Sequence, residues 1–314
     1  MRVKIWGARG SVPASGPDTK YYGGNTACLS VATDSGELLI LDAGSGIRAL
    51  GKSLVTGREA QTVQAAVLLS HYHWDHILGI PYFQPLYGAD NRLAFFSYRH
   101  PNSSFQEVIE STMGAPYFPI SMRQLASRRE FYEVSDQCFQ IGGVHVVSRR
   151  LNHPQGCLGY RLECGGRVIT YATDHEPDGG VCDNNLLALA AGADLLIIDA
   201  QYTQEEYEGC RRGWGHGTWE SGVEIARRCA VSQLLLFHHD PDRSDAELHS
   251  IVHQAQRRFS AVEAAAEGME IYLAERAAVP GQPPKRLPTG GEWAVKDCFE
   301  HSHVTTSSRA RWAS

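Results

Sequence analysis

Four short apolar stretches in this sequence each run into a side chain that can bind a metal ion or carry a proton. Such stretches predict buried strands. Because α/β folds gather their chemistry where strands end along one edge of a sheet, the four segments predict one active site built from distant parts of the chain. The segments are VLLS before His71, ITYAT before Asp174, LLII before Asp199 and LLLF before His238.

Strand and helix patterns alternate along most of the chain. We predict helices over 47–54, 105–113, 186–191, 218–229 and 245–259, and Thr218 is a suitable N-cap for the fourth of them. We predict strands over 2–6, 29–33, 38–41, 65–69, 144–151, 159–164, 167–172, 195–198, 234–237 and 270–273. Strands interleaved with helices in this way predict an α/β fold of two sheets with helices outside, an αββα sandwich.

Two regions depart from that regular pattern. Residues 80–135 are rich in aromatic residues and prolines, and we expect an insertion or cap over the site there. Residues 280–314 are polar and rich in Pro, Gly and Ser, which predicts a disordered tail. The remaining 1–279 would form one hydrolase domain.

Composition limits the partners and the location of the protein. The 314 residues carry a formal charge of −6, so no strong nucleic-acid binding is expected. No apolar run approaches the roughly 18 residues needed to cross a bilayer, and the start lacks the apolar core of a secretory signal. The eight cysteines include no CxxC pair, which favours reduced thiols and a cytoplasmic protein.

The densest chemical signal is the segment His71-Tyr72-His73-Trp74-Asp75-His76. Imidazole nitrogen and carboxylate oxygen are the ligands that zinc and neighbouring first-row metals prefer. The segment is too compact for one metal ion to use every side chain. Since alternate residues of an extended chain point in opposite directions, the ligands can divide into two pairs. A fortuitous histidine-rich surface loop is the alternative.

This HxHxDH segment resembles the metallo-β-lactamase superfamily of hydrolases, and within it the tRNase Z-like phosphodiesterase branch. The similarity covers about residues 2–275 and is greatest to bacterial and phage enzymes that hydrolyse cyclic nucleotides, including anti-Pycsar phosphodiesterases. It extends to five further segments, which are Gly7-Ala8-Arg9-Gly10-Ser11, Gly23-Gly24-Asn25-Thr26, Leu41-Asp42-Ala43-Gly44-Ser45-Gly46, Trp74-Asp75-His76-Ile77-Leu78-Gly79-Ile80-Pro81 and His238-His239-Asp240-Pro241.

The resemblance implies a ligand set for two divalent metal ions. Zinc is the first expectation, and manganese or iron would suit the same ligands. Asp174 would bridge both ions. The first ion would be held by His71, His73 and His153, and the second by Asp75, His76 and His238, with His239 as the competing choice for the last position.

The resemblance also implies residues that assist the metal ions. His216 resembles a proton donor to the leaving oxygen, although a helix-capping turn histidine is the alternative; Asp75 would belong to the catalytic group as well as to the ligands. Asp42 and Asp199 would orient other side chains, although Asp42 could instead stabilise its own Gly-rich turn, and His239 would support its neighbour. Asn25 and Thr26 would approach the substrate phosphate or else only close their loop.

The function implied is hydrolysis of cyclic nucleotides by a hydroxide that bridges the two metal ions. A tRNA 3′-processing endonuclease is the main rival. The negative charge opposes it, as does the short interval between His153 and Asp174, where tRNase Z enzymes insert a tRNA-gripping arm. A phosphoribosyl cyclic phosphodiesterase, a carboxyl-type hydrolase, a non-catalytic ligand-binding sensor and a redox di-iron protein are further alternatives. We expect a homodimer, with Met113–Ile120 as a cap or dimer contact or else as ordinary core packing.

Overall fold

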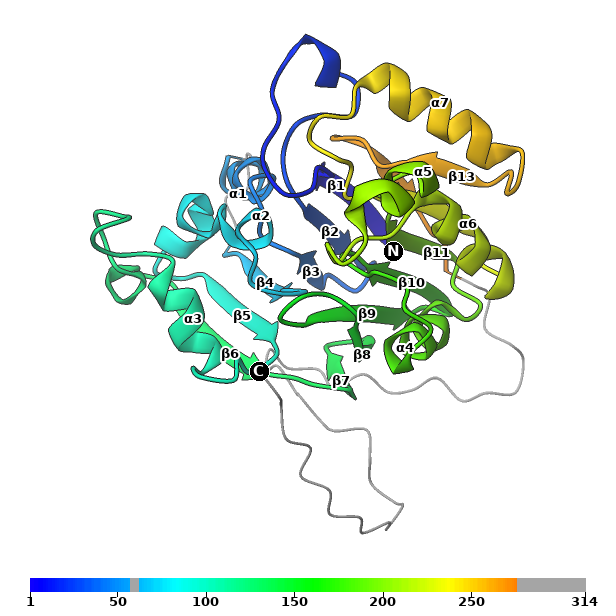
Figure 1. Cartoon of the computed structure of the whole chain (residues 1–314). Helices are drawn as coiled ribbons and strands as arrows, with labels where there is room; N and C mark the ends of the chain where they lie inside the picture. Colours follow the sequence, from blue (N-terminus) through cyan, green and yellow to red (C-terminus); the bar gives the residue numbers. More distant parts are fainter. Residues whose placement is uncertain (57–61, 276–314) are drawn as a thin grey trace, which may run out of the picture.

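Two seven-stranded β-sheets face each other in the computed structural model, which describes residues 1–56 and 62–275 (Figure 1). In the first sheet β3, β4, β5 and β6 run parallel, whereas β14, β1, β2 and β3 alternate in direction. Its strands, in spatial order, are β14 (Glu270–Tyr272), β1 (Arg2–Gly7), β2 (Cys28–Ala32), β3 (Leu38–Leu41), β4 (Gln64–Leu68), β5 (Arg92–Ser97) and β6 (Arg128–Glu133).

The second sheet has a parallel half and an antiparallel half. Strands β10 to β13 pair in parallel, and β7 to β10 pair antiparallel. Its strands, in spatial order, are β13 (Val262–Ala264), β12 (Gln233–Phe237), β11 (Leu195–Asp199), β10 (Arg167–Ala172), β9 (Cys157–Cys164), β8 (Val144–Leu151) and β7 (Gln137–Ile141).

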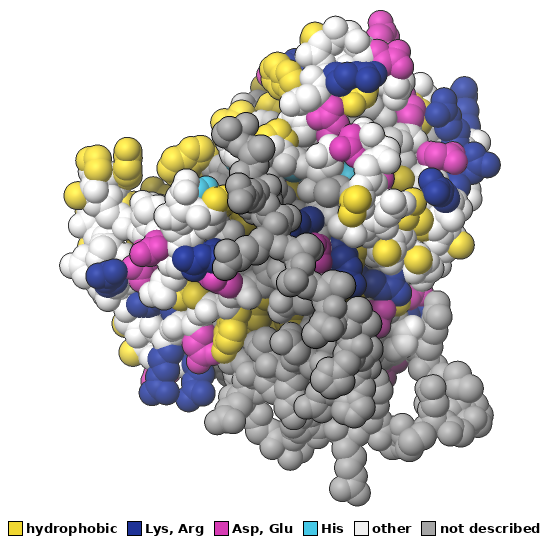
Figure 2. Space-filling model, turned by 60° about the horizontal axis from the view of Figure 1, so that its bottom comes forward, with side chains coloured by type: hydrophobic (Ala, Val, Ile, Leu, Met, Phe, Trp, Pro, Cys, Tyr) yellow, Lys and Arg dark blue, Asp and Glu magenta, His cyan; other side chains and the backbone are white. Residues whose placement is uncertain are grey.

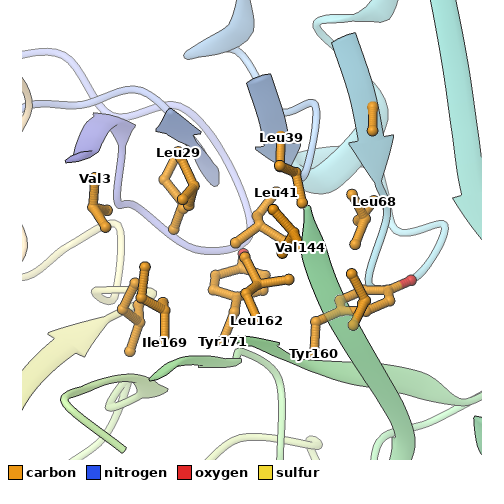
Figure 3. Packing of buried hydrophobic residues seen from close by; sticks show 14 of the residues in the cluster. Val3, Leu29, Leu39, Leu41, Leu68, Val144, Tyr160, Leu162, Ile169 and Tyr171 are labelled. Carbon is orange, nitrogen blue, oxygen red and sulfur yellow. The ribbon is translucent and has the colours of Figure 1, made fainter. Parts of the chain in front are cut away.

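Three apolar clusters give the molecule its layers. The central cluster joins the inner faces of the sheets, with Leu41 and Leu68 on one side and Leu162 and Tyr171 on the other (Figure 3). A second cluster covers the outer face of the β1–β6 sheet with α1 (Ile47–Val55) and α3 (Phe105–Ser111). The third packs α4 (Val181–Ala190), α6 (Trp219–Arg228) and α7 (Asp245–Gln256) on the β7–β13 sheet. The predicted αββα sandwich is confirmed.

Short helical segments occupy the connections. Thr218 caps α6 through its side-chain oxygen, which accepts from the Ser221 amide at 3.1 Å, as predicted. Among the described residues, no helix has the length and apolar character needed to traverse a membrane. The short segments are η1 (Pro17–Thr19), α2 (Trp74–Ile77), η2 (Ile80–Tyr82), η3 (Gln84–Tyr87), η4 (Met122–Gln124), α5 (Gln204–Glu206) and the π-helix η5 (Tyr207–Arg211).

The reading of residues 80–135 as an insertion or cap was wrong in part, because β5 and β6 lie within it and extend the first sheet. Strand β6, RREFYE, shows no run of apolar residues, since it forms the sheet edge and only its pairing with β5 makes it a strand. Helix α4 begins five residues before the predicted start. Its first residues include Asp183 and two asparagines, and these polar residues interrupt the apolar pattern from which a helix is predicted. The predicted tail, 280–314, lies outside the described residues.

Candidate metal centre

The carboxyl ends of four strands meet at one edge of the sandwich. Strands β10, β11 and β12 are parallel neighbours, so the residues at or just beyond their carboxyl ends lie side by side. These residues are Asp174, Asp199 and His238, and β4 of the facing sheet brings the segment beginning at His71 to the same place. The site is therefore assembled from both sheets.

The first group of potential ligands is His71, His73, His153 and Asp174, whose ligand atoms all lie within 4.8 Å of one another. Nε2 of His153 lies 3.0 Å from Nδ1 of His73. The Oδ2 atom of Asp174 lies 3.5 Å from Nε2 of His71 and 3.6 Å from Nε2 of His153. Four donor atoms thus converge on one small volume.

The second group is Asp75, His76 and His238. Nε2 of His238 lies 3.2 Å from Nε2 of His76 and 3.0 Å from Oδ2 of Asp75. The other oxygen of Asp174, Oδ1, lies 3.3 Å from His76 and 3.4 Å from His238. Asp174 therefore turns one carboxylate oxygen to each group, as a residue shared by two cations would.

Ring nitrogens without a hydrogen-bond partner indicate whether this arrangement fits metal ions. Nε2 of His71 is buried and has no hydrogen-bond partner among the described residues. The two Nε2 atoms of His76 and His238 face each other, and two lone pairs at that separation repel unless a proton or cation lies near them. Nitrogen and carboxylate donors in this combination suit zinc and its neighbours. The His/Asp clusters are thus suited to a dinuclear metal site.

The outer ring nitrogens of the candidate ligands are occupied by acceptors, which fixes each ring in one orientation. Asp42 is the acceptor for His76 at 2.7 Å, consistent with an orienting role. The remaining acceptors were not identified from the sequence; Ser70 adjoins its histidine in the chain, whereas the other three come from distant segments. They are Ser70 Oγ for His71 at 3.0 Å, Gln155 Oε1 for His73 at 3.0 Å, the Gly215 carbonyl for His153 at 2.7 Å and Gln201 Oε1 for His238 at 2.9 Å.

The protonation states of His71, His153 and Asp75 favour metal binding, whereas that of His76 opposes it. Burial lowers the pKa of His71 and brings that of His153 to about 4, so both rings are neutral at pH 7. Burial alone would raise the pKa of Asp75, but the neighbouring His76 outweighs it and lowers that pKa. Burial alone would lower the pKa of His76, but Asp75 and two other carboxylates outweigh burial and raise it. A metal ion must therefore displace a proton from His76.

Three residues of the site hold a left-handed backbone. The φ angles of Asp42, Asp174 and His238 are 59°, 52° and 58°. Such a conformation costs a non-glycine residue roughly 1 kcal/mol and is concentrated at functional sites. It turns the side chains that follow β3, β10 and β12 out of the strand alternation and towards the metal centre.

The ring of His216 contacts one histidine of each ligand group. Its ring stacks on His238, with centroids 4.9 Å apart, and lies 5.2 Å from the ring of His153. Nδ1 donates to Oδ2 of Asp199 at 2.7 Å. Burial lowers the pKa of His216, but the Asp199 carboxylate outweighs burial and raises it to about 9. The imidazole is therefore protonated at neutral pH and can supply a proton.

Glu176 braces the loop that carries His216, and it was not identified from the sequence. One carboxylate oxygen accepts from the Gly213 amide at 2.7 Å and from the Tyr207 hydroxyl at 2.8 Å. The other accepts from the Gly215 amide at 2.7 Å. Since the carbonyl of Gly215 holds His153, this one side chain positions both a candidate ligand and the candidate proton donor.

Comparison with known proteins places this architecture in a family. The family model described as a beta-lactamase superfamily domain matches residues 38–239, which is more than half of the chain. The chain belongs to the β-lactamase superfamily. Proteins named ribonuclease Z are among its relatives and a solved diphosphatase shares its fold, and within this superfamily the chain is a metal-dependent hydrolase.

Three relatives of this superfamily member span nearly its whole fold. Ribonuclease Z of Salinispora arenicola (strain CNS-205) is 25% identical over 304 residues, covering 81% of this chain and 90% of that protein. A diphosphatase from the PhnP family has a TM-score of 0.63 at 16% identity, with 87% and 98% of the two chains covered. The short form of human tRNase Z has a TM-score of 0.62 at 19% identity, with 87% and 100% covered.

Two expected roles in this hydrolase find no support in the geometry. Asn25 is hydrogen-bonded to the Ser45 hydroxyl and to Glu267, which suits the alternative in which its side chain closes the loop. Thr26 is likewise buried and accepts from the Ser45 amide. His239 donates to the carbonyl of Ala265 and lies outside both ligand groups, which leaves His238 as the residue in the cluster.

Proposed function

We propose that this protein hydrolyses the phosphodiester of cyclic nucleotides at a site for two divalent metal ions, with zinc as the first choice and manganese or iron as alternatives. The observation that carries the proposal is the division of the Asp174 carboxylate between the two ligand groups. The first ion would be held by His71, His73, His153 and Asp174, and the second by Asp75, His76, His238 and Asp174.

When bound, two such ions lower the pKa of water and neutralise phosphate oxygens. The chain supplies the other requirements. The acceptors behind each imidazole hold the ligand rings in place. His216, held by Asp199, would donate its proton to the departing ribose oxygen, a step worth roughly 10²–10⁴ in rate. Asp75 would contribute as a fixed carboxylate ligand of the second ion, because its Oδ2 accepts from the Ser11 amide at 2.6 Å and lies 3.0 Å from Nε2 of His238.

A tRNA 3′-processing endonuclease is the second candidate, supported by the relatives named ribonuclease Z. Two observations count against it. Strands β9 and β10 are joined through Gly165 and Gly166 alone, which leaves no arm between His153 and Asp174. On the face shown in Figure 2, outside the grey region, basic and acidic side chains are interspersed and do not form a basic stripe. Phosphoribosyl cyclic phosphodiesters, which carry the same kind of bond in a related ring, are a third choice.

The proposal is tested with the purified protein on cyclic CMP, UMP, AMP and GMP, precursor tRNA, a phosphoribosyl cyclic phosphate and a lactam, each with and without chelator. We expect chelator-sensitive hydrolysis of one or more cyclic nucleotides, and its loss in His73→Ala and Asp174→Asn. Retained turnover in either variant would refute the metal site. Cleavage of precursor tRNA alone would replace the proposed substrate with the second candidate.

A homodimer is proposed separately. Within the predicted contact Met113–Ile120, Tyr117 is 78% exposed, and the nearby Tyr82, which packs edge-on against Phe118, is 56% exposed. Two large exposed aromatic rings on one surface suit a protein–protein contact. Sedimentation velocity of the wild type and of Tyr117→Asp distinguishes a dimer through this surface from a monomer.

A further inference from the structure

Two cavities adjoin the candidate metal centre on the side of α3. The inner cavity, of about 290 Å³, reaches His71 and His73 at one end. The outer cavity, of about 430 Å³, extends towards Arg99 and Glu133. Tyr98, His100, Gln155 and Gly156 line both cavities, and we call the two neighbouring cavities together the α3 groove. It leads directly away from the ligand atoms.

The lining of the α3 groove is aromatic and close to charge balance. Tyr72 and Tyr98 lie with ring centroids 4.7 Å apart, and His100 packs edge-on against Tyr72. Arg99 pairs with Glu133 at 3.1 Å, so neither charge is free to attract a chain of phosphates. Aromatic faces bind nucleic-acid bases by stacking, whereas a polyanion requires unpaired basic residues.

Gln155 connects the groove to the metal centre. Nδ1 of His73 is turned towards the ligand group, so its Nε2 carries the hydrogen and donates to Oε1 of Gln155. This hydrogen bond fixes the orientation of the Gln155 amide and leaves its NH₂ group available as a donor. No partner for that nitrogen is found within residues 1–56 and 62–275. An oriented donor therefore borders the groove beside a metal ligand.

We propose that the α3 groove binds the base and ribose of a single nucleotide, with His100 and the tyrosines contacting the base and the Gln155 amide donating to the substrate. The inference rests on the proposed phosphodiesterase function and makes its substrate class specific: one nucleoside, joined to the phosphate at the metal centre. The groove volume suits a ligand of that size, since small-molecule sites are usually about 300–1,000 Å³.

The first test compares two diesters in the metal-loaded protein. One is the cyclic nucleotide that the protein cleaves best, and the other is methyl p-nitrophenyl phosphate, which has no nucleoside. His100→Ala should lower kcat/KM for the nucleotide about tenfold, the loss expected for one base contact, and leave the simple diester within about twofold. The matched control is His253→Ala, the same change at an exposed position of α7, and should alter neither.

The second test needs neither metal nor turnover. Saturation-transfer NMR with adenosine and cytidine on the metal-free protein should detect nucleoside binding in the wild type and His253→Ala, with a severalfold weaker signal in His100→Ala. Gln155→Met should weaken the same signal and also reduce zinc affinity in a separate titration, because it removes the acceptor for His73.

The outcomes separate the groove from the chemistry. Equal effects of His100→Ala on both diesters, or none on either, would overturn the groove assignment. Cleavage of precursor tRNA by His100→Ala at the wild-type rate, without cleavage of mononucleotides, would overturn it in favour of RNA. If no diester were cleaved but the nucleoside signal still depended on His100, the phosphodiesterase proposal would fail and the groove would stand.

Discussion

Replacing Asp42 by asparagine tests whether the residues behind the metal centre control it. The Asp42 carboxylate is fully buried between the sheets. Its Oδ1 accepts from the Ser70 amide at 2.7 Å. Its Oδ2 accepts from the Ser70 hydroxyl at 2.8 Å, from Nδ1 of His76 at 2.7 Å and from the Tyr171 hydroxyl at 2.7 Å. Four donors therefore depend on one side chain.

The magnitude follows from which donors can adapt. The hydroxyls of Ser70 and Tyr171 can rotate and accept from an asparagine NH₂ group, but the Nδ1–H of His76 cannot accept while Nε2 faces the metal site. One buried donor left unsatisfied costs about 2 kcal/mol. For a domain of this size the expected fall in Tm is about 4–8 °C. Loss of the orienting acceptor should weaken metal binding about 10–100-fold.

Two measurements check these values. Thermal unfolding in chelator gives the stability cost without metal, and competition with a zinc-binding dye gives the change in affinity. Asp90→Asn, an exposed position, is the control and should match the wild type in both. If Asp42→Asn kept its zinc affinity within about twofold and its Tm unchanged, the reasoning that Asp42 orients His76 would be refuted.

Three further predictions concern the same site. In the wild type, kcat should fall as the pH rises through about 9, because the pKa of His216 is raised to that value and the ring then loses its proton. The protonated ring should stabilise the fold fully below pH 6.5, its ordinary pKa, and this stabilisation should be lost as the pH rises from 6.5 to about 9. A pH–rate profile checks this, and His216→Gln should show low activity without a fall in kcat near pH 9. Glu176→Gln should lower kcat about tenfold, since one loop N–H would face an amide NH₂, whereas the exposed Glu224→Gln should not; equal activity of the two variants in a steady-state assay would contradict a bracing role. Removing metal should lower Tm by about 5–10 °C relative to zinc at a hundredfold excess over its Kd, and an unchanged melting curve in chelator would mean that the seven candidate ligands bind no metal ion.

Local sequence was sufficient to predict the sandwich and the segments that build the centre. The strand ends at His71, Asp174, Asp199 and His238 were recognisable because an apolar strand and the polar residue after it are neighbours in the chain. Edge strand β6 could not be recognised in this way. Its residues are all exposed or half-buried, without a strict alternation, so only pairing with β5 distinguishes it from a loop.

The sequence by itself determined the fold class and the inventory of imidazoles and carboxylates, because both follow from patterns within short stretches. The tertiary structure decided which of the adjacent His238 and His239 faces the centre, since the left-handed backbone at His238 breaks the alternation that a strand would predict. It also decided the outer contacts: Asp42 meets His76 across 34 positions and Gln155 meets His73 across 82. Contacts over such separations arise from the packing of two sheets, which leaves no local pattern in the chain.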